Sequence, residues 1–326
     1  MQYTFRSQSI AIEFDKIRAS HERIRAHIHR TQVMTSSRLN EASGASLFFK
    51  CENFQKIGAF KARGATNAVF ALEEATVRRG VATHSSGNHG AAVARAAKLR
   101  GIPAHIVMPS NSAKVKVRAV ESYGAHVVFC EPTEKAREEK CAEVIKKTGA
   151  TLIHSFENEH VIAGQGTAAL ELLEDVSDLD VVMCPVGGGG LLSGTAIAAK
   201  SMRPKIKVIA VEPANADDAA QSFRAGRRIV TQKEFTIADG LRTNVGERTF
   251  PIIQRSVDDI VTVSEGAIVS AMRTIWETMK IVVEPSAAVP NAAIVENKIA
   301  LNGKRVGIIL TGGNVDLDTL PWMTCR

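Results

Sequence analysis

The chain has 326 residues, a formal net charge of +7, 45% apolar residues and 23% charged residues. This composition is ordinary for a globular protein and excludes an intrinsically disordered one. No uninterrupted apolar run reaches the ~20 residues that span a bilayer, so a membrane-spanning protein is excluded too. At ~150 residues per domain, the length predicts about two domains.

The cysteines and the basic residues carry little information about partners. Five cysteines lie far apart and form no CxxC pair, which argues against a disulfide scaffold or a zinc ribbon. The N-terminal residues lack the apolar core of a signal peptide, so we expect a cytoplasmic protein with reduced thiols. Lys and Arg are spread along the chain, and Tyr and Trp number two each. Nucleic acid is therefore a poor partner, and anionic small molecules are favoured.

Short β-branched runs alternate with longer Ala-rich stretches along the chain. Strands are predicted over 47–51, 80–84, 105–108, 126–129, 151–153, 181–184, 208–211, 260–263 and 306–310. Helices are predicted over 91–100, 113–123, 135–148, 164–173, 191–202 and 265–279. This alternation, with continuously apolar strands, predicts an α/β fold with mostly parallel sheets. Ligands bind such sheets at the loops beyond the C-terminal ends of the strands.

Four consecutive glycines follow the strand at 181–184 and lead into a helix. Glycine lets the backbone approach a ligand closely, and free N–H groups at a helix N-terminus suit a phosphate. The chain has no GxxxxGK[ST] motif, which excludes a P-loop, and the loop lacks GxGxxG, which disfavours a dinucleotide. A phosphate monoester on a smaller cofactor is favoured, and a flexible turn is the alternative.

Two further loops carry reactive side chains. Lys61 lies in the small, apolar segment 58–65 that leads into a helix. Burial of a lysine favours its neutral amine, which forms Schiff bases with aldehydes. Judged on this segment alone, an ordinary surface lysine is the favoured interpretation. Residues 83–90 gather hydroxyls, an amide and an imidazole at a helix N-terminus, which suits a carboxylate. The alternative there is a polar turn that caps the helix.

Two acidic segments raise the question of a metal. The loop from Glu212 to Asp218 has three carboxylates in seven residues, which suits Mg²⁺ or Ca²⁺. Judged on these residues alone, an acidic turn that caps the next helix is the favoured interpretation. The segment from His154 to His160 holds two histidines and two acids without HExxH spacing, and it is interpreted as a surface loop.

A phosphate loop, a Schiff-base lysine and a carboxylate loop together indicate pyridoxal phosphate acting on an amino acid. Over nearly its whole length the chain resembles the fold-type II pyridoxal-phosphate enzymes, in the branch of serine racemase and serine/threonine dehydratase. The resemblance is carried by segments 48–52, 58–65, 83–90, 162–167, 187–190, 212–218, 238–240 and 312–316. It implies a tryptophan synthase β-like fold with two open, twisted, mostly parallel sheets. A large domain (1–79 and 158–326), a small domain inserted in it (80–157) and a homodimer are expected.

The resemblance also implies a role for individual residues. The expected cofactor-binding residues are Phe60, Lys61, Asn88, Gly187, Gly188, Gly189, Gly190, Leu191, Gly240 and Thr311. The expected substrate-binding residues are Ser85, Ser86, Asn88, His89, Arg137 and Thr243. Lys61 would carry the cofactor and take the α-proton, and Ser86 would be the acid/base on the opposite face. Glu212, the carbonyl of Ala216 and Asp218 would bind Mg²⁺, Ca²⁺ or Mn²⁺, in place of the acidic turn.

The implied activity is a dehydratase that converts serine, threonine or 3-hydroxyaspartate into a 2-oxo acid and ammonia, with racemase activity at the same site. The neutral Thr311 at the pyridine nitrogen favours rapid loss of the β-hydroxyl. Ile57 and Ala91 replace polar residues near the nucleotide-activator site of the mammalian racemase, so no ATP activation is expected. Phe156 is more typical of a dehydratase. The alternatives are a cysteine synthase-like β-replacement enzyme and a non-catalytic amino-acid-binding protein.

Overall fold

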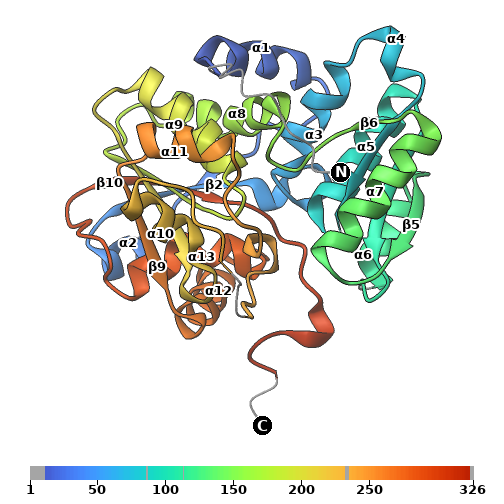
Figure 1. The fold of residues 1–326 in the computed structure, drawn as a ribbon. Coiled ribbons are helices and arrows are strands. Elements are labelled where there is room, and N and C mark those ends of the chain that lie inside the picture. The colour runs from blue at the N-terminus through green and yellow to red at the C-terminus, as the bar shows by residue number, and fades with distance from the viewer. Residues whose placement is uncertain (1–11, 86, 113, 232–234, 324–326) are drawn as a thin grey trace.

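The computed structural model describes residues 12–85, 87–112, 114–231 and 235–323, and in these residues two sheets are each covered by helices (Figure 1). The six-stranded sheet has the order β1-β2-β10-β7-β8-β9, and only the β1–β2 pair is antiparallel within the described residues. The four-stranded sheet has the order β5-β4-β3-β6 and is parallel. The strands are β1 (Val33–Met34), β2 (Ser46–Cys51), β3 (Val81–His84), β4 (Ala104–Pro109), β5 (His126–Cys130), β6 (Thr151–Leu152), β7 (Val181–Pro185), β8 (Lys207–Pro213), β9 (Asp259–Val263) and β10 (Arg305–Leu310).

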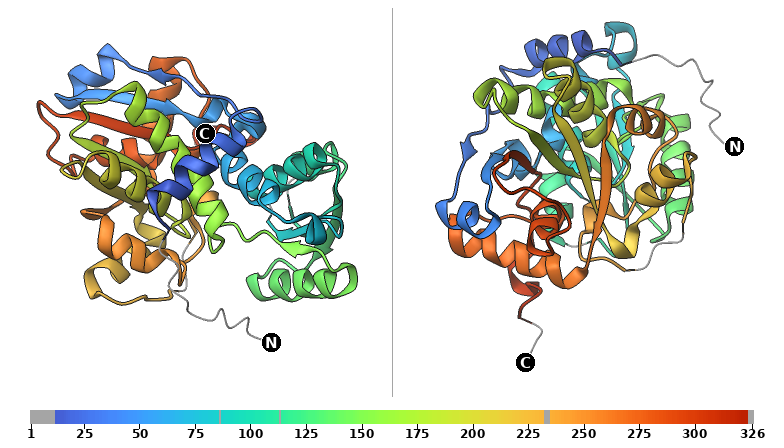
Figure 2. Two further views of the ribbon diagram at one scale, coloured as in Figure 1. Left: turned by 90° about the horizontal axis from the view of Figure 1, so that it is seen from above. Right: turned by 90° about the vertical axis from the view of Figure 1, so that its left-hand side faces the viewer.

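The helices surround the two sheets, and the four-stranded sheet with its helices lies to one side of the molecule (Figure 2). The α-helices are α1 (Phe14–Ile24), α2 (Ser37–Ser43), α3 (Lys61–Phe70), α4 (Glu74–Val77), α5 (Asn88–Arg100), α6 (Lys114–Glu121), α7 (Glu134–Thr148), α8 (Glu159–Asp175), α9 (Gly190–Met202), α10 (Asp218–Ala225), α11 (Thr249–Ser256), α12 (Glu265–Met279) and α13 (Pro285–Val295). The 3₁₀ turns are η1 (Glu52–Phe54), η2 (Lys56–Gly58), η3 (Ala214–Ala216), η4 (Asp239–Leu241) and η5 (Leu317–Thr319).

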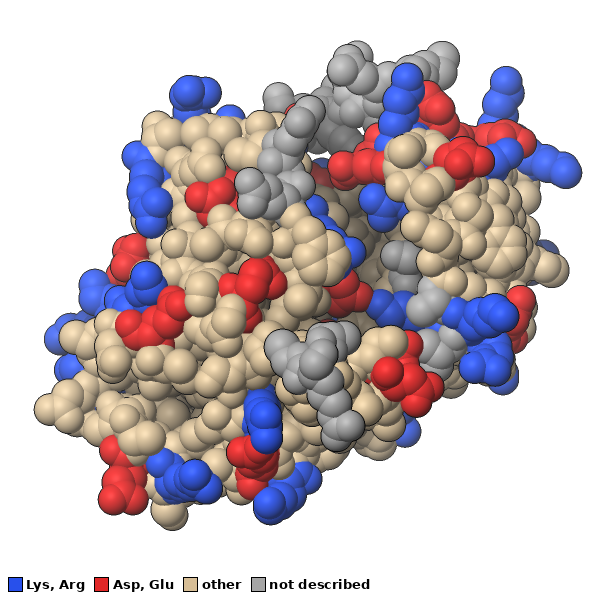
Figure 3. Space-filling model, turned by 90° about the horizontal axis from the view of Figure 1, so that it is seen from below, with Lys and Arg blue, Asp and Glu red and all other residues tan. Residues whose placement is uncertain are grey.

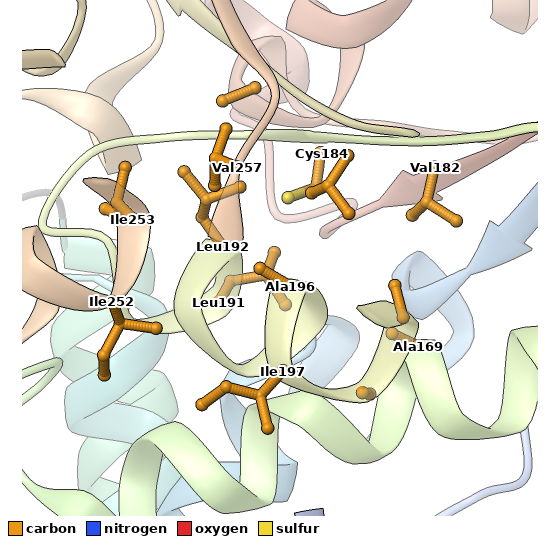
Figure 4. Packing of buried hydrophobic residues seen from close by; sticks show 14 of the residues in the cluster. Ala169, Val182, Cys184, Leu191, Leu192, Ala196, Ile197, Ile252, Ile253 and Val257 are labelled. Atoms are coloured by element: carbon orange, nitrogen blue, oxygen red, sulfur yellow. The ribbon is translucent and has the colours of Figure 1, made fainter. Parts of the chain in front are cut away.

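The core of the larger sheet follows from the alternation of side chains along its strands. Val182 and Cys184 of β7 pack on one face against α8, α9 and α11, whereas Met183 belongs to the opposite face under α12 and α13. Figure 4 shows the first of these layers, with Cys184 above Leu192. Because both faces are covered, the strand is apolar at every position, as its sequence predicts.

The four-stranded sheet is built entirely from residues 81–152. Helices α3, α5 and α6 bury one of its faces, and α7 buries the other. All four of its strands fall inside the segment 80–157 that we expect to be an inserted domain. The division of the chain into these two domains stays a prediction.

The predicted elements are confirmed, with ends that differ by a few residues. The exceptions are elements that the pattern did not show, and α13 is the most informative of them. Its segment is interrupted by Glu284, Pro285 and Pro290, yet it forms a helix because Glu284 is the N-cap and Pro285 takes the first turn. Strand β1 has two residues, too few for a pattern. Among the described helices, none has the length and apolar character needed to span a membrane.

Candidate active site

A cleft of about 1630 Å³ opens between the two sheets, at the C-terminal ends of β3, β7 and β10. Its walls include every predicted cofactor- and substrate-binding residue that the structure describes; Ser86 lies outside the described residues. These wall residues are Phe60, Lys61, Ser85, Asn88, His89, Arg137, Gly187, Gly188, Gly189, Gly190, Leu191, Gly240, Thr243 and Thr311. Figure 3 shows the surface hollowed between the two parts, with basic and acidic side chains interspersed around it.

Lys61 is the first residue of α3, and its amine lies in the cleft. Its Nζ donates a hydrogen bond to the carbonyl oxygen of Ser155 (3.1 Å) and stands 5.1 Å from the centre of the Phe60 ring. Burial lowers the pKa of Lys61 to about 8, and the charge of Glu284 opposes that shift. A neutral, nucleophilic amine is therefore accessible near physiological pH.

The glycine loop joins β7 to α9, and each of its residues is held against other parts of the chain. A Cβ on Gly188 would lie 2.2 Å from Cδ1 of Phe156, and one on Gly187 would lie 3.0 Å from the Cα of Leu241. Gly189 has φ 88°, a conformation that other residues adopt only with strain. Within the described chain, the N–H groups at 187–191 donate no hydrogen bond. Free N–H groups at the start of a buried helix form a cradle for a phosphate.

Thr311 follows β10, the strand that pairs with β7, and it also lines the cleft. Its hydroxyl is buried and has no hydrogen-bond partner among the described residues. A buried polar atom without a partner is costly, and a ligand atom would satisfy it. The carbonyl of Thr311 accepts the N–H of Phe60 (2.9 Å), which ties this strand end to the residue before Lys61.

Glu284 is a buried acid of the cleft that was not predicted as a site residue. Its two oxygens accept hydrogen bonds from Nδ2 of Asn88, at 2.9 and 3.2 Å, and Asn314 donates to Oδ1 of Asn88 (2.8 Å). Burial, with the nearby charge of Asp239, raises the pKa of Glu284 to about 7. A glutamate directly before the proline that starts a helix was the available signal. Glu284 orients Asn88, and its carboxyl group is partly protonated at physiological pH.

The segment at the end of β3 has the polar groups that suit a carboxylate. Oγ of Ser85 accepts the N–H of Gly87 (3.2 Å), and α5 begins at Asn88. The ring of His89 is turned inward, where Nε2 pairs with the carbonyl oxygen of Ile153 (2.9 Å). Because a carbonyl oxygen only accepts, Nε2 carries the proton and Nδ1 is an acceptor. Any contact of His89 with a carboxylate would therefore involve its backbone N–H.

Two further histidines that were not predicted as site residues also line the cleft. The rings of His84 and His154 meet edge to face at 5.8 Å, and Nδ1 of His154 accepts the N–H groups of Phe156 and Glu157. Burial lowers the pKa of His84 to about 4 and that of His154 to about 3, so both rings are neutral at physiological pH. Residues His154 to Glu157 therefore line the cleft, a role that the interpretation as a surface loop did not predict.

Two arginines of the cleft wall, the predicted Arg137 and also Arg242, differ in how far their side chains are engaged by the protein. Arg137 extends from α7 into the cleft wall, where its charge contributes to the low pKa of His84. Arg242 instead donates twice to the carbonyl oxygen of Thr236, at 3.0 and 2.7 Å, and stacks on Phe235. Among the described residues, the side chain of Arg137 has a single, longer hydrogen bond, from Nε to the carbonyl oxygen of Thr133 (3.4 Å), and Arg137 is thus the better placed of the two for a substrate.

The predicted metal ligands lie together at the end of β8, outside the cleft. Glu212, Ala216 and Asp218 are buried, and both carboxylates accept backbone N–H groups: Glu212 from α10 and Asp218 from Val245 (2.6 Å). Among the described residues, no group of three or more His, Cys, Asp or Glu side chains is arranged to hold a metal. The predicted ligands are only two carboxylates and one backbone carbonyl, which is fewer acidic side chains than such a group would have. The cation site therefore stays a prediction.

The cleft fits pyridoxal phosphate by the chemistry of its walls. A nucleophilic lysine, a glycine cradle at a helix N-terminus and a buried, unpartnered hydroxyl are the groups that its aldehyde, phosphate and ring nitrogen require.

Comparison with known proteins gives the same class. The family model of the pyridoxal-phosphate dependent enzymes matches residues 24–312, so the chain belongs to this family, and its cofactor is pyridoxal phosphate. The β-hydroxyaspartate dehydratase of Paracoccus denitrificans is 51% identical over 309 residues, which cover 95% of this chain and 98% of that protein. The serine racemase of Arabidopsis thaliana is 49% identical over 318 residues, 96% of each chain. The solved structure of maize serine racemase has a TM-score of 0.93 at 48% identity, and the match covers 96% of each chain.

Proposed function

We propose that the protein is an ammonia-lyase for 3-hydroxy amino acids (serine, threonine or 3-hydroxyaspartate), with racemase activity at the same site. The observation that carries the proposal is Lys61, whose amine has a pKa of about 8 and lies in one cleft with the glycine loop and Thr311. Relatives named serine racemase and β-hydroxyaspartate dehydratase, each about half identical in sequence, support it.

The chemistry assigns separate tasks to cofactor and protein. Pyridoxal phosphate, when bound, supplies the electron sink that makes the α-hydrogen of an amino acid acidic. The neutral amine of Lys61, held by the carbonyl of Ser155, accepts that hydrogen as a proton. The β-carbon then loses hydroxide, and the released enamine takes up water to give a 2-oxo acid and ammonia. If the β-hydroxyl is kept and Ser86 instead donates its hydroxyl proton to the opposite face of the α-carbon, while Lys61 keeps the proton it took, the product is the enantiomer of the substrate.

One buried group, the Thr311 hydroxyl, favours elimination over a long-lived carbanion. The Thr311 hydroxyl is neutral, so it leaves the ring nitrogen of the cofactor less protonated than a carboxylate would. Asn88, oriented by Glu284, is the group that would contact the ring hydroxyl. Gly187 to Leu191 would hold the phosphate, and Phe60 and Gly240 would flank the ring.

The substrate would be held by its carboxylates. The α-carboxylate would meet Ser85, Asn88 and the N–H of His89 at the start of α5, with Thr243 facing them from the other wall. Arg137 would bind the second carboxylate of 3-hydroxyaspartate, because the neutral His84 beside it cannot supply the charge. We propose Mg²⁺, with Ca²⁺ or Mn²⁺ as alternatives, for Glu212, the Ala216 carbonyl and Asp218. The homodimer and the cytoplasmic location stay predictions.

A substrate panel tests the proposal. L-Serine, L-threonine and 3-hydroxyaspartate are incubated with the protein, and 2-oxo acid, ammonia and D-amino acid are measured. We expect product from at least one substrate, and its absence from all three would overturn the proposal. Lys61→Ala is expected to lose the absorption band of the bound cofactor and all turnover. A protein that only binds amino acids would keep its affinity in that variant, and a β-replacement enzyme would form product only when a nucleophile is added.

Arg137→Gln tests the substrate class within the panel. We expect kcat/KM for 3-hydroxyaspartate to fall by about tenfold or more, because a charge-assisted hydrogen bond is lost, while kcat/KM for serine stays within about twofold. Lys135→Gln, on the same helix, is the matched control for the loss of one positive charge. An equal loss for both substrates would contradict the role of Arg137.

A further inference from the structure

A network of buried charges lies directly behind Lys61. Arg63, Lys50 and Glu52 are fully buried, and Glu171 is 1% exposed. Arg63 comes from α3, Lys50 from β2, Glu52 from η1 and Glu171 from α8. The network therefore joins the helix that starts at Lys61 to three other parts of the molecule, and its two cations balance its two anions.

Arg63 uses all of its N–H donors in this network. Nε and Nη2 donate to the two oxygens of Glu52, at 2.7 and 2.8 Å, and Nη1 and Nη2 donate to the two oxygens of Glu171, at 2.8 and 2.7 Å. The second hydrogen of Nη1 goes to Oγ1 of Thr167 (3.1 Å). Burial acts to lower the pKa of Arg63, and the two carboxylates raise it well above its usual value. The guanidinium is thus clamped in plane from two sides.

Other contacts also hold the backbone of the first turn of α3 in place. Before Lys61, the N–H of Phe60 is bonded to Thr311, and Ala59 bridges to Gly312. After Arg63, the backbone approaches α8 so closely that a Cβ on Gly164 would lie 2.7 Å from the Cα of Gly64. Residues two apart on a helix point about 200° apart, so Arg63 reaches into the protein from the side opposite to Lys61.

Stability alone does not explain these buried charges, because well-packed apolar residues often replace a buried ion pair at no loss of stability. What a two-sided fork supplies is a fixed orientation. We propose that Arg63 is a positioning residue for the cofactor lysine: clamped by Glu52 and Glu171, it fixes the first turn of α3 and so holds the Lys61 amine at its place in the cleft. The proposal rests on Lys61 carrying the cofactor, as in the proposed function.

The test follows the capture of pyridoxal phosphate by the full-length protein after its cofactor has been removed. Capture is measured by the absorption band, and borohydride reduction followed by mass spectrometry locates the cofactor on Lys61. Arg63→Lys keeps the charge and loses the fork. We expect capture to slow about tenfold and the midpoint of its pH profile to rise by about one unit, because a displaced amine regains water.

Lys50→Met is the matched control. It removes a buried cation from the same network, where Nζ of Lys50 lies 2.8 Å from Glu171, but Lys50 has no hydrogen bond to α3 among the described residues. We expect the thermal midpoint of this variant to fall. Its capture rate should stay within about twofold of the parent, and the midpoint of its pH profile within a few tenths of a unit.

Parent-like capture by Arg63→Lys, or an equal loss in Lys50→Met, would overturn the positioning role. If Arg63→Lys does not fold, Glu52→Gln replaces it, since the amide keeps one acceptor oxygen. A smaller shift of the pH midpoint in the same direction is then expected, and an unchanged midpoint overturns the proposal. A parent that captures the cofactor but converts no substrate refutes the proposed function and leaves this result intact.

Discussion

The glycine loop gives the sharpest prediction, because the structure places a specific ring against it. Gly188→Ala puts a Cβ 2.2 Å from Cδ1 and 2.4 Å from Cε1 of Phe156, well inside van der Waals contact. Either the ring or the loop must move, and overpacking of this kind costs about 1–3 kcal/mol. Since the loop is proposed to hold the phosphate, we expect pyridoxal phosphate to bind about 5- to 150-fold more weakly.

The assay is an absorbance titration of the cofactor-free protein, run as a double-mutant cycle with Phe156→Ala. Removal of the ring makes room for the new methyl group, so the two substitutions should be coupled by about 1 kcal/mol or more. Gly266→Ala on α12 is the control, because the nearest atom to its Cβ is 4.0 Å away. Affinity within about twofold of the parent is expected for it. Unchanged binding by Gly188→Ala, or no coupling with Phe156→Ala, would refute the reasoning.

Three other predictions concern single side chains. Ser86→Ala is expected to abolish formation of D-serine from L-serine while 2-oxo acid is still formed, as chiral chromatography would show; loss of both products would contradict its role. The pKa of Glu284 is raised from 4.5 to about 7, and its side chain is 5% exposed, so the folded state holds the proton longer than the unfolded state. Stability of the parent should therefore fall by about 3 kcal/mol as pH rises from 4.5 to 7, and Glu284→Gln should lack this fall in urea unfolding; parallel curves for the two proteins would exclude it. Asp218→Ala should make activity and thermal midpoint insensitive to EDTA and added Mg²⁺, and an unaltered response would argue against the cation site.

Many strands, helices and site loops of this protein can be predicted from residues that are adjacent in the sequence. The strands of the larger sheet are apolar at consecutive positions because both of their faces are covered, so runs such as 181–184 are recognisable by themselves. Four adjacent glycines before a helix report a close backbone approach, and the structure supplies the neighbours that demand it. Lys61 and the segment 83–90 were identified because they occur together with the glycine loop, and the family resemblance that these segments carry implies their roles.

The tertiary structure decided what depends on residues far apart in the chain. The raised pKa of Glu284 comes from burial and from the nearby charge of Asp239, and the hydrogen-bond partner Asn88, which opposes the shift, lies 196 positions away. No local pattern in the sequence predicts this arrangement. The clamp on Arg63 joins Glu52 and Glu171, which only the packing of α3 against α8 brings together. Sequence alone determined which groups of reactive residues exist and where strands and helices run, because those depend on neighbours along the chain. Burial, charge balance and orientation were decided by the fold, because desolvation and hydrogen bonding are set by whichever residues become neighbours in space.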